Sequence, residues 1–180
     1  MSMASTVVLD SGALQRALVR MAHQIAERNP NGEGVVLAGV QTGGVHLARR
    51  LAILLKEIWM IEVPCGTLDA TMHRDDLDTR GTLQVHATRI PGDIQGKTVV
   101  LVDDVLFSGR TTRAALDALN DYGRPRRVQL AVLVDRGHRD LPIQPDFVGA
   151  AVATTLAQRI DVKLLENDRH DEVRLEELPA

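Results

Sequence analysis

One stretch near the middle of the chain, residues 99–112, constrains the fold most strongly. It reads Val-Val-Leu-Val-Asp-Asp-Val-Leu-Phe-Ser-Gly-Arg-Thr-Thr, so an apolar run ends in two adjacent carboxylates. A short loop with hydroxyl side chains and Gly109 follows, and then a helical pattern of apolar residues that stops before Gly123. Because β-branched runs favour strands and this apolar spacing favours a helix, the stretch predicts a buried strand, an acidic pair, a loop and a helix N-terminus.

This combination points to a particular kind of ligand. The carboxylates of Asp103 and Asp104 can accept hydrogen bonds from vicinal hydroxyls such as those of a ribose. The free backbone N–H groups at the helix start, together with Ser108, Thr111 and Thr112, form a seat for a phosphate. Acidic residues can also end a buried strand without binding anything, but the loop that follows favours a sugar phosphate site.

The same stretch resembles the thirteen-residue motif with which type I phosphoribosyltransferases bind 5-phosphoribosyl 1-pyrophosphate (PRPP). Residues 103–111, Asp-Asp-Val-Leu-Phe-Ser-Gly-Arg-Thr, are similar to one branch in particular, the pyrimidine operon regulator/uracil phosphoribosyltransferase (PyrR) family. The resemblance covers residues 7–165. It implies one α/β domain over residues 1–180 with the type I phosphoribosyltransferase fold, a mostly parallel central sheet flanked by helices with a small hood. Strands that alternate with helices, with binding loops at the strand ends, indicate the same architecture.

The resemblance implies an enzyme, a pentosyltransferase that transfers ribose 5-phosphate from PRPP to uracil and yields UMP and pyrophosphate. Its catalytic residues would be Asp103, Asp104 and Arg74. Mg²⁺ would be held mainly by the pyrophosphate and the ribose hydroxyls, without a direct protein ligand, and the two aspartates would reach it through water. The residues that would bind PRPP or UMP are Val105, Leu106, Phe107, Ser108, Gly109, Arg110, Thr111, Thr112, Thr42, Gly43, Gly44 and Asp135.

Two further segments correspond to family loops. Residues 39–45 are glycine-rich and lie between an apolar run and a helical pattern, which alone is typical of a tight turn; in the family this segment is the loop that binds pyrophosphate. The family usually has an arginine where this chain has Gly43, so we expect weaker contacts to pyrophosphate. Residues 73–89 correspond to the flexible loop that closes over the site, with Arg74 reaching the pyrophosphate; alone, this stretch is typical of a hairpin loop.

The family also suggests a second function, a sensor of UMP or PRPP that binds the leader RNA of pyrimidine operons, with weak or no transferase activity. The residues that would contact RNA are Arg16, Arg20, His23, Arg28, His138 and Arg139. From the pattern alone, Arg16, Arg20 and His23 belong, together with Glu27, to a solvated face opposite the apolar stripe of the first predicted helix. Val19, Gln144 and Ala150 replace polar or basic residues that we expect in the family's RNA-binding members.

Composition limits the alternatives. The formal net charge of −3 provides no overall basic field for nucleic acid, so RNA binding requires a local patch. One cysteine excludes an intrachain disulfide and suits a reducing cytoplasm, and neither a signal peptide nor a membrane span is evident, so we expect a cytoplasmic protein. Family members associate, so we expect a homo-oligomer. Residues 92–98 end in Gly-Lys-Thr like a nucleotide-binding P-loop, but they are one residue short and precede a strand, so we interpret them as a turn.

The remaining elements follow from periodicity and turn residues. We expect a helix with Leu14, Leu18, Met21 and Ile25 on its apolar face, capped by Asp10 or Ser11. A second helix passes through residues 47–55. The expected strands span residues 6–9, 35–40, 65–72 and 128–134, with edge strands at 160–165 and 173–178.

Overall fold

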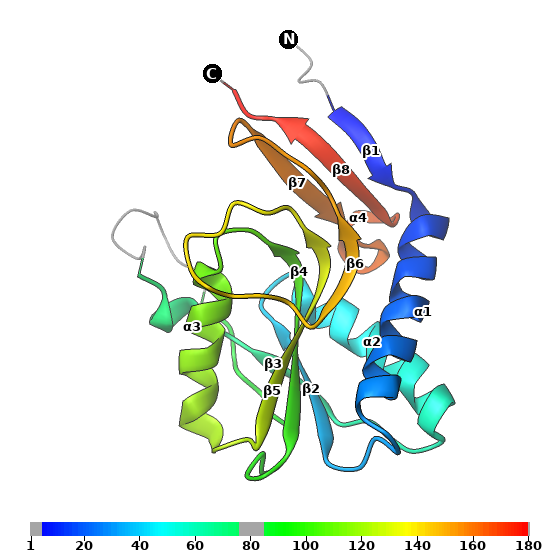
Figure 1. Ribbon diagram of the computed structural model, residues 1–180, viewed down its shortest axis with the longest axis vertical. Helices are drawn as coiled ribbons and strands as arrows, with labels where there is room; N and C mark the ends of the chain where they lie inside the picture. Colours follow the sequence, from blue (N-terminus) through cyan, green and yellow to red (C-terminus); the bar gives the residue numbers. More distant parts are fainter. Residues whose placement is uncertain (1–4, 76–84, 180) are drawn as a thin grey trace.

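The computed structural model describes residues 5–75 and 85–179, and its centre is a five-stranded parallel sheet (Figure 1). The strand order is β3-β2-β4-β5-β6, and all four neighbouring pairs are parallel. These strands are β2 (Val35–Val40), β3 (Cys65–Leu68), β4 (Thr98–Leu106), β5 (Arg127–Asp135) and β6 (Phe147–Ala151). The strand β4 lies in the middle and carries the acidic pair.

Helices cover both faces of this sheet. The helices α1 (Ser11–Arg28) and α2 (Gly44–Trp59) pack on one face, and α3 (Arg110–Leu119) packs on the other (Figure 1). Because side chains alternate along a strand, Val100 and Val102 of β4 join the core under α1 and α2, whereas Val99 and Leu101 join the core under α3. Both faces of β4 are therefore buried, which explains why apolar and polar residues do not alternate along this strand before Asp103.

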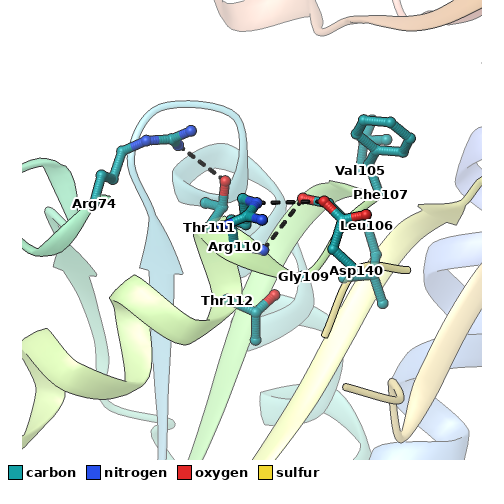
Figure 2. A pocket seen from close by; sticks show the side chains of 10 residues that line it. Arg74, Val105, Leu106, Phe107, Gly109, Arg110, Thr111, Thr112 and Asp140 are labelled. Atoms are coloured by element: carbon teal, nitrogen blue, oxygen red, sulfur yellow. Dashed lines mark hydrogen bonds and ion pairs between the residues drawn. The ribbon is translucent and has the colours of Figure 1, made fainter. Parts of the chain in front are cut away.

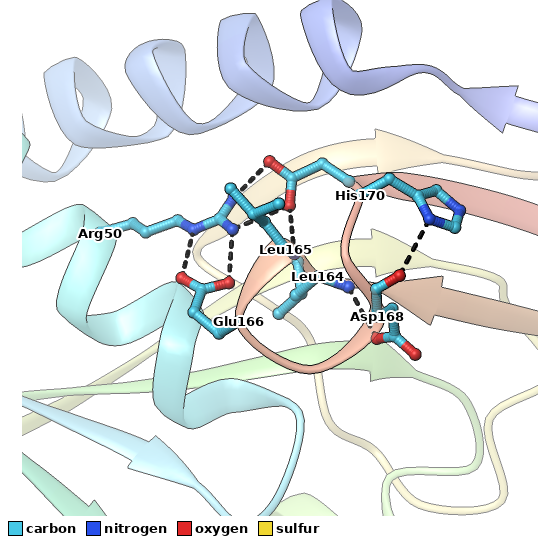
Figure 3. Close-up of polar contacts among 7 residues, drawn as sticks. Arg50, Leu164, Leu165, Glu166, Asp168 and His170 are labelled. Atoms are coloured by element: carbon cyan, nitrogen blue, oxygen red, sulfur yellow. Dashed lines mark hydrogen bonds and ion pairs between the residues drawn. The ribbon is translucent and has the colours of Figure 1, made fainter.

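A second, smaller sheet forms the hood. Its antiparallel strands are β1 (Ser5–Leu9), β8 (Glu172–Glu177) and β7 (Gln158–Lys163), in that order, with the short helix α4 (Leu165–Asp168) between β7 and β8. Arg50 of α2 connects this hood to the helix layer on the central sheet. Its guanidinium donates to both carboxylate oxygens of Glu166 and of Asp171 (Figure 3). Its side chain is 17% exposed, so the contact is largely shielded from water.

Most expected elements are confirmed. Asp10 caps α1, since its Oδ1 accepts a hydrogen bond of 2.7 Å from the Ala13 N–H, and the apolar face of α1 is buried. Residues 92–98 form a turn in which the Lys97 N–H donates to the Ile94 carbonyl, as expected. Within the described part of the chain, no helix is long and apolar enough to cross a membrane.

One expected strand was wrong in extent, and one strand was missed. The strand expected over residues 65–72 ends at Leu68, because Asp69 accepts a hydrogen bond from the Thr71 N–H and turns the chain into a 3₁₀ helix, η1 (Thr71–His73). The strand β6 was not expected from the sequence; its five residues include Gly149 and two alanines, which have low strand propensity. A second 3₁₀ helix, η3 (Asn120–Tyr122), follows α3.

Candidate functional site

The loops at the carboxyl ends of β2, β4 and β5 meet at one edge of the sheet. The parallel register pairs Gly39 with Val102 and Leu106 with Asp135, so the glycine-rich loop, the acidic pair and the start of the β5–β6 connection become neighbours. Ligands of open parallel sheets bind in this position.

A cavity of about 300 Å³ lies beside the end of β4 (Figure 2). Every lining residue except Asp140 belongs to the set expected from the sequence. The lining residues are Arg74, Val105, Leu106, Phe107, Ser108, Gly109, Arg110, Thr111, Thr112 and Asp140.

The N-terminus of α3 lines this cavity and is suited to bind an anion. Gly109 adopts φ +92°, a conformation that side chains disfavour, and turns the loop into the helix. Ser108 fixes the loop, because its carbonyl accepts hydrogen bonds from the N–H groups of Asp140 and Leu141 at 3.0 and 3.1 Å. The first N–H groups of a helix have no partner within it, so those of α3 can donate to a phosphate placed here.

Arg74 reaches this cavity from the far side, after η1. Its Nη1 donates to the Thr111 Oγ1 at 2.9 Å (Figure 2). The next residue, Asp75, accepts hydrogen bonds from Arg110 at 2.7 Å and from Arg113 at 3.3 Å, so the start of the predicted flexible loop is bound to α3. Residues 76–84 of that loop lie outside the described residues.

The acidic pair lies just before the cavity, still within β4. Asp103 is buried, and its Oδ1 accepts a hydrogen bond of 2.9 Å from the Asp104 N–H. Burial, and secondly the negative charge of Asp104, raise the pKa of Asp103 well above its ordinary value. Asp104 is more accessible, and its Oδ1 accepts from the Val105 N–H at 2.7 Å. The two carboxyl groups therefore differ in environment although they are adjacent in sequence.

The glycine-rich loop packs directly on this pair. A Cβ on Gly43 would lie 2.0 Å from Oδ2 of Asp104, and a Cβ on Gly44 would lie 2.0 Å from the Val102 carbonyl oxygen. Thr42 precedes them, and its carbonyl accepts from the Val45 N–H at 3.4 Å at the start of α2. The structure thus places Gly43 against the Asp104 carboxylate and Gly44 against the backbone of Val102 and Asp103. A Cβ at residue 44 would meet backbone atoms, so that position requires glycine, whereas a Cβ at residue 43 would require the Asp104 side chain to move.

Asp135 ends β5 and is engaged within its own loop. It accepts hydrogen bonds from Arg139 Nη2 at 2.7 Å and from the Gly137 N–H at 3.0 Å. Although burial raises the pKa of Asp135, these hydrogen bonds outweigh burial and hold it below its ordinary value. Arg139 also donates to the carbonyls of Ile143 at 2.9 Å and Phe107 at 3.0 Å, so its guanidinium organises the loop beside the cavity.

The other basic residues expected to contact RNA lie on an exposed face of α1. Arg16, Arg20, His23 and Arg28 are all exposed. Arg20 donates to the Gly149 carbonyl of β6, and Arg28 pairs with Asp146 at 3.0 Å. His138 lies instead beside the cavity, where its Nε2 lies 2.7 Å from the Thr154 carbonyl. Among the described residues, no hydrogen bond or ion pair joins His138 or Arg139 to the group on α1.

The described residues hold no cluster of three or more histidine, cysteine, aspartate or glutamate side chains that could ligate a metal. The carboxylates of Asp103 and Asp104 are hard oxygen donors, which Mg²⁺ prefers. This donor set fits an ion that takes most of its oxygens from a bound substrate and from water.

Three residues of the site were not among the individual candidates chosen from the sequence: Asp75, Asp140 and Arg136. Asp75 and Asp140 both pair with Arg110, a relationship that only the fold creates. Arg136 is buried beside Phe107, and its signal was its place in the polar run that follows β5.

Comparison with known proteins identifies relatives over nearly the whole chain. A family model described as a phosphoribosyl transferase domain matches residues 5–166. A protein named bifunctional protein PyrR from Geobacter sp. (strain M21) is 55% identical over 173 residues, which cover 96% of this chain and 98% of the relative. Another of that name, from Streptomyces coelicolor, is 56% identical over 174 residues, with 96% and 90% covered.

Solved structures share the fold at lower identity. A hypoxanthine-guanine phosphoribosyltransferase from Bacillus anthracis superposes with a TM-score of 0.73 at 21% identity, with 97% of this chain and 99% of that chain covered. A hypoxanthine phosphoribosyltransferase from Trypanosoma cruzi, in complex with the product IMP, superposes with a TM-score of 0.63 at 19% identity, with 81% and 75% covered. These two likenesses concern the fold.

Proposed function

The chain belongs to the phosphoribosyltransferase family, in the branch of the PyrR proteins, and from this premise we propose that it transfers ribose 5-phosphate from PRPP to uracil. The observation that carries the proposal is the cavity in which an anion-binding helix N-terminus lies next to a pair of carboxylates. A ribose bearing a 5-phosphate needs both features, and PRPP adds a pyrophosphate on the side of Gly43 and Arg74.

In this proposal the backbone N–H groups of residues 107–111, with the hydroxyls of Ser108, Thr111 and Thr112, bind the 5-phosphate. Val105, Leu106, Gly109 and Arg110 complete the same wall of the cavity. The pyrophosphate lies against Thr42, Gly43 and Gly44, and Arg74 neutralises part of its charge. Asp135 lies on the base side.

The reaction breaks the bond between C1 of the ribose and the pyrophosphate oxygen, and forms a bond between C1 and N1 of uracil, which loses its proton. Positive charge develops at C1 in the transition state. Asp103 and Asp104 hold the ribose hydroxyls, and a carboxylate placed near C1 stabilises that charge. Mg²⁺, when bound with PRPP, offsets the charge of the departing pyrophosphate.

The test is incubation of the protein with PRPP, Mg²⁺ and uracil, with UMP measured as product. We expect UMP to form only when all three are present. Binding of UMP without its formation from uracil and PRPP would replace the transferase by a nucleotide sensor, because the phosphate and ribose sites would then be occupied without turnover.

A second candidate function, regulation through leader RNA of pyrimidine operons, is favoured by the exposed basic face of α1 and by the word bifunctional in the relatives' names. Affinity for such RNA should fall steeply with salt concentration, because binding of phosphates by arginine releases counterions. Arg16→Gln and Arg20→Gln should weaken binding and reduce the salt dependence. No binding at low salt would leave the transferase function alone.

Two properties complete the proposal. We place the protein in the cytoplasm, which suits its free cysteine, Cys65. We also propose that it forms a homo-oligomer, which is supported by exposed apolar side chains on the C-terminal half of α2 and directly after it, among them Ile53 and Met60. Sedimentation at several protein concentrations tests the second property.

A further inference from the structure

Phe107 presents an aromatic ring at the side of the cavity, immediately after the acidic pair and before the phosphate seat (Figure 2). The residue is 39% exposed and lines the cavity. Its N–H belongs to the proposed phosphate seat, but that role does not require a ring.

The ring is held by two neighbours from the loop after β5. The guanidinium carbon of Arg136 lies 4.3 Å from the ring centroid, over its face. The ring of His138 approaches at 6.1 Å between centroids with an angle of 65° between planes, an edge-on contact. Cation and edge contacts on an aromatic ring are favourable, so Phe107 is fixed in one orientation.

Arg136 is itself fixed from behind. It is 8% exposed, its Nε donates to the Thr154 Oγ1 at 3.1 Å, and its Nη2 donates to the Thr155 carbonyl at 2.9 Å. In the described part of the chain it forms no ion pair with a carboxylate, so its buried charge is balanced only by neutral groups and by the ring. Burial of a guanidinium without a carboxylate partner costs desolvation free energy. We attribute this cost to a role of Arg136 in positioning the ring.

We propose that the ring of Phe107 stacks on the nucleobase and that Arg136 is the positioning residue that holds the ring in place. The inference rests on the proposed function and extends it to the base side of the site. In the proposed binding mode Asp103 and Asp104 hold the ribose, and its phosphate lies at the start of α3. Phe107 lies between these two sites in the chain, so its side chain is within reach of a base attached to the ribose. Stacking of a base on an aromatic side chain contributes about 1–3 kcal/mol.

The first experiment compares the affinities of UMP and ribose 5-phosphate, measured by calorimetry, in the wild type and in Phe107→Leu. The two ligands share the phosphate and the ribose and differ in the base. We expect the variant to bind UMP about tenfold more weakly, which corresponds to about 1.4 kcal/mol, and to bind ribose 5-phosphate as before. Tyr122→Leu, an exposed aromatic beyond the other end of α3, serves as the matched control and should change neither affinity.

The second experiment tests Arg136 through a double-mutant cycle. Arg136→Met should weaken UMP but not ribose 5-phosphate, and it should cause little further loss in the Phe107→Leu background, because its effect passes through the ring. Thr154→Val provides an independent route, since it removes the Oγ1 hydrogen bonds to the guanidinium and to the backbone carbonyl of Arg136 without removing the charge, and we expect a smaller loss that is again selective for UMP. Arg127→Met, at the opposite end of β5, is the control for loss of an arginine.

The outcomes separate this inference from the proposed function. If uracil is not a substrate but UMP binds more tightly than ribose 5-phosphate, the transferase proposal fails and the stacking inference is still tested by Phe107→Leu. If Phe107→Leu weakens both ligands equally, the ring supports the phosphate seat and the stacking inference is overturned. Additive losses for Phe107→Leu and Arg136→Met overturn the positioning role of Arg136.

Discussion

Gly43 lies directly against the carboxylate of Asp104, so close that a Cβ at residue 43 would be 2.0 Å from Oδ2 and 2.3 Å from Cγ. The loop proposed to bind pyrophosphate and the residue proposed to hold the ribose therefore share one surface. An arginine in place of Gly43, as the family pattern suggests, cannot be added without movement of Asp104. Gly43 therefore lacks the cation that the family pattern provides, and it also leaves room for the Asp104 carboxylate.

The contact predicts the effect of Gly43→Ala. The new methyl group displaces the Asp104 carboxylate and breaks its hydrogen bond with the Val105 N–H, so we expect kcat/KM for PRPP to fall by about tenfold or more. Gly43→Arg should suffer the same displacement while it adds a cation, and therefore should lower kcat more than it changes KM for PRPP. The control is Gly12→Ala in the first turn of α1, where a Cβ meets the end of the Arg16 side chain, and activity should be unchanged. Wild-type activity in both Gly43 variants would contradict this account.

The two carboxyl groups of the pair should respond differently to amide substitution. Asp104→Asn removes a charge beside the ribose site and should reduce kcat strongly, by about 100-fold. Asp103→Asn should have a smaller effect on kcat, because burial and the charge of Asp104 already favour the protonated form of Asp103. Steady-state kinetics of both variants with PRPP varied makes the comparison.

The raised pKa of Asp103 also predicts a gain in stability for Asp103→Asn in the absence of ligands. At neutral pH the unfolded carboxyl group, with a pKa of about 3.9, ionises freely, whereas burial and the charge of Asp104 make ionisation of the folded group less favourable. The stabilising contribution of this carboxyl group to the free energy of unfolding is therefore complete below pH ~4 and is lost as the pH rises. Thermal unfolding should show a higher Tm for the variant at pH 7 and equal values near pH 3.5; a lower Tm at pH 7 would contradict the assignment.

Arg74 should distinguish the two anionic ends of PRPP. If it serves the pyrophosphate, Arg74→Gln weakens PRPP and pyrophosphate by about 10- to 100-fold and leaves UMP, which lacks pyrophosphate, nearly unaffected. Its hydrogen bond to Thr111 places it within reach of the phosphate seat as well. An equal loss for UMP would therefore reassign Arg74 to the 5-phosphate. Arg113→Gln, at an arginine that pairs with Asp75, the residue after Arg74, but does not line the cavity, is the control.

The contact between Arg50 and the hood predicts how stability depends on acid. Hydrogen bonds from Arg50 are the main cause that lowers the pKa of both Glu166 and Asp171 in the folded protein (Figure 3). A lowered folded pKa means that the stabilisation is present above the unfolded values of about 4 and is lost as the pH falls below them. Arg50→Met should lower the free energy of unfolding by about 2 kcal/mol at pH 7 and by less at pH 3, measured by denaturant titration. An equal loss at both pH values would show that the charges do not matter.

Much of the fold and of the cavity was predictable because local chemistry and global structure agree there. The β-branched run before Asp103 forms a strand in any buried sheet, and the Ser-Gly-Arg-Thr segment after Phe107 is compatible with a loop and a helix start. Residues 105–112 are adjacent in sequence and remain adjacent around the cavity. Such a site can be identified from one stretch of sequence.

What could not be predicted depends on contacts between distant residues. The distance between Gly43 and Asp104 depends on how β2 and β4 pair, and the position of Arg136 over Phe107 depends on the register between β4 and β5. The strand β6 gave no signal because small residues fill it where α1 packs closely, a tertiary effect that outweighs propensity. The hydrogen bonds from Arg50 to Glu166 and Asp171 join residues more than 110 positions apart.

The measurement that tests the central claim most directly is release of pyrophosphate from PRPP with different nucleobases. The account predicts release that depends on Mg²⁺ and on uracil, little or none with hypoxanthine or guanine, and loss of release in Asp104→Asn. Release with a purine but not with uracil would contradict the proposed substrate. No release with any base, in a protein that still binds UMP, would contradict the transferase function itself.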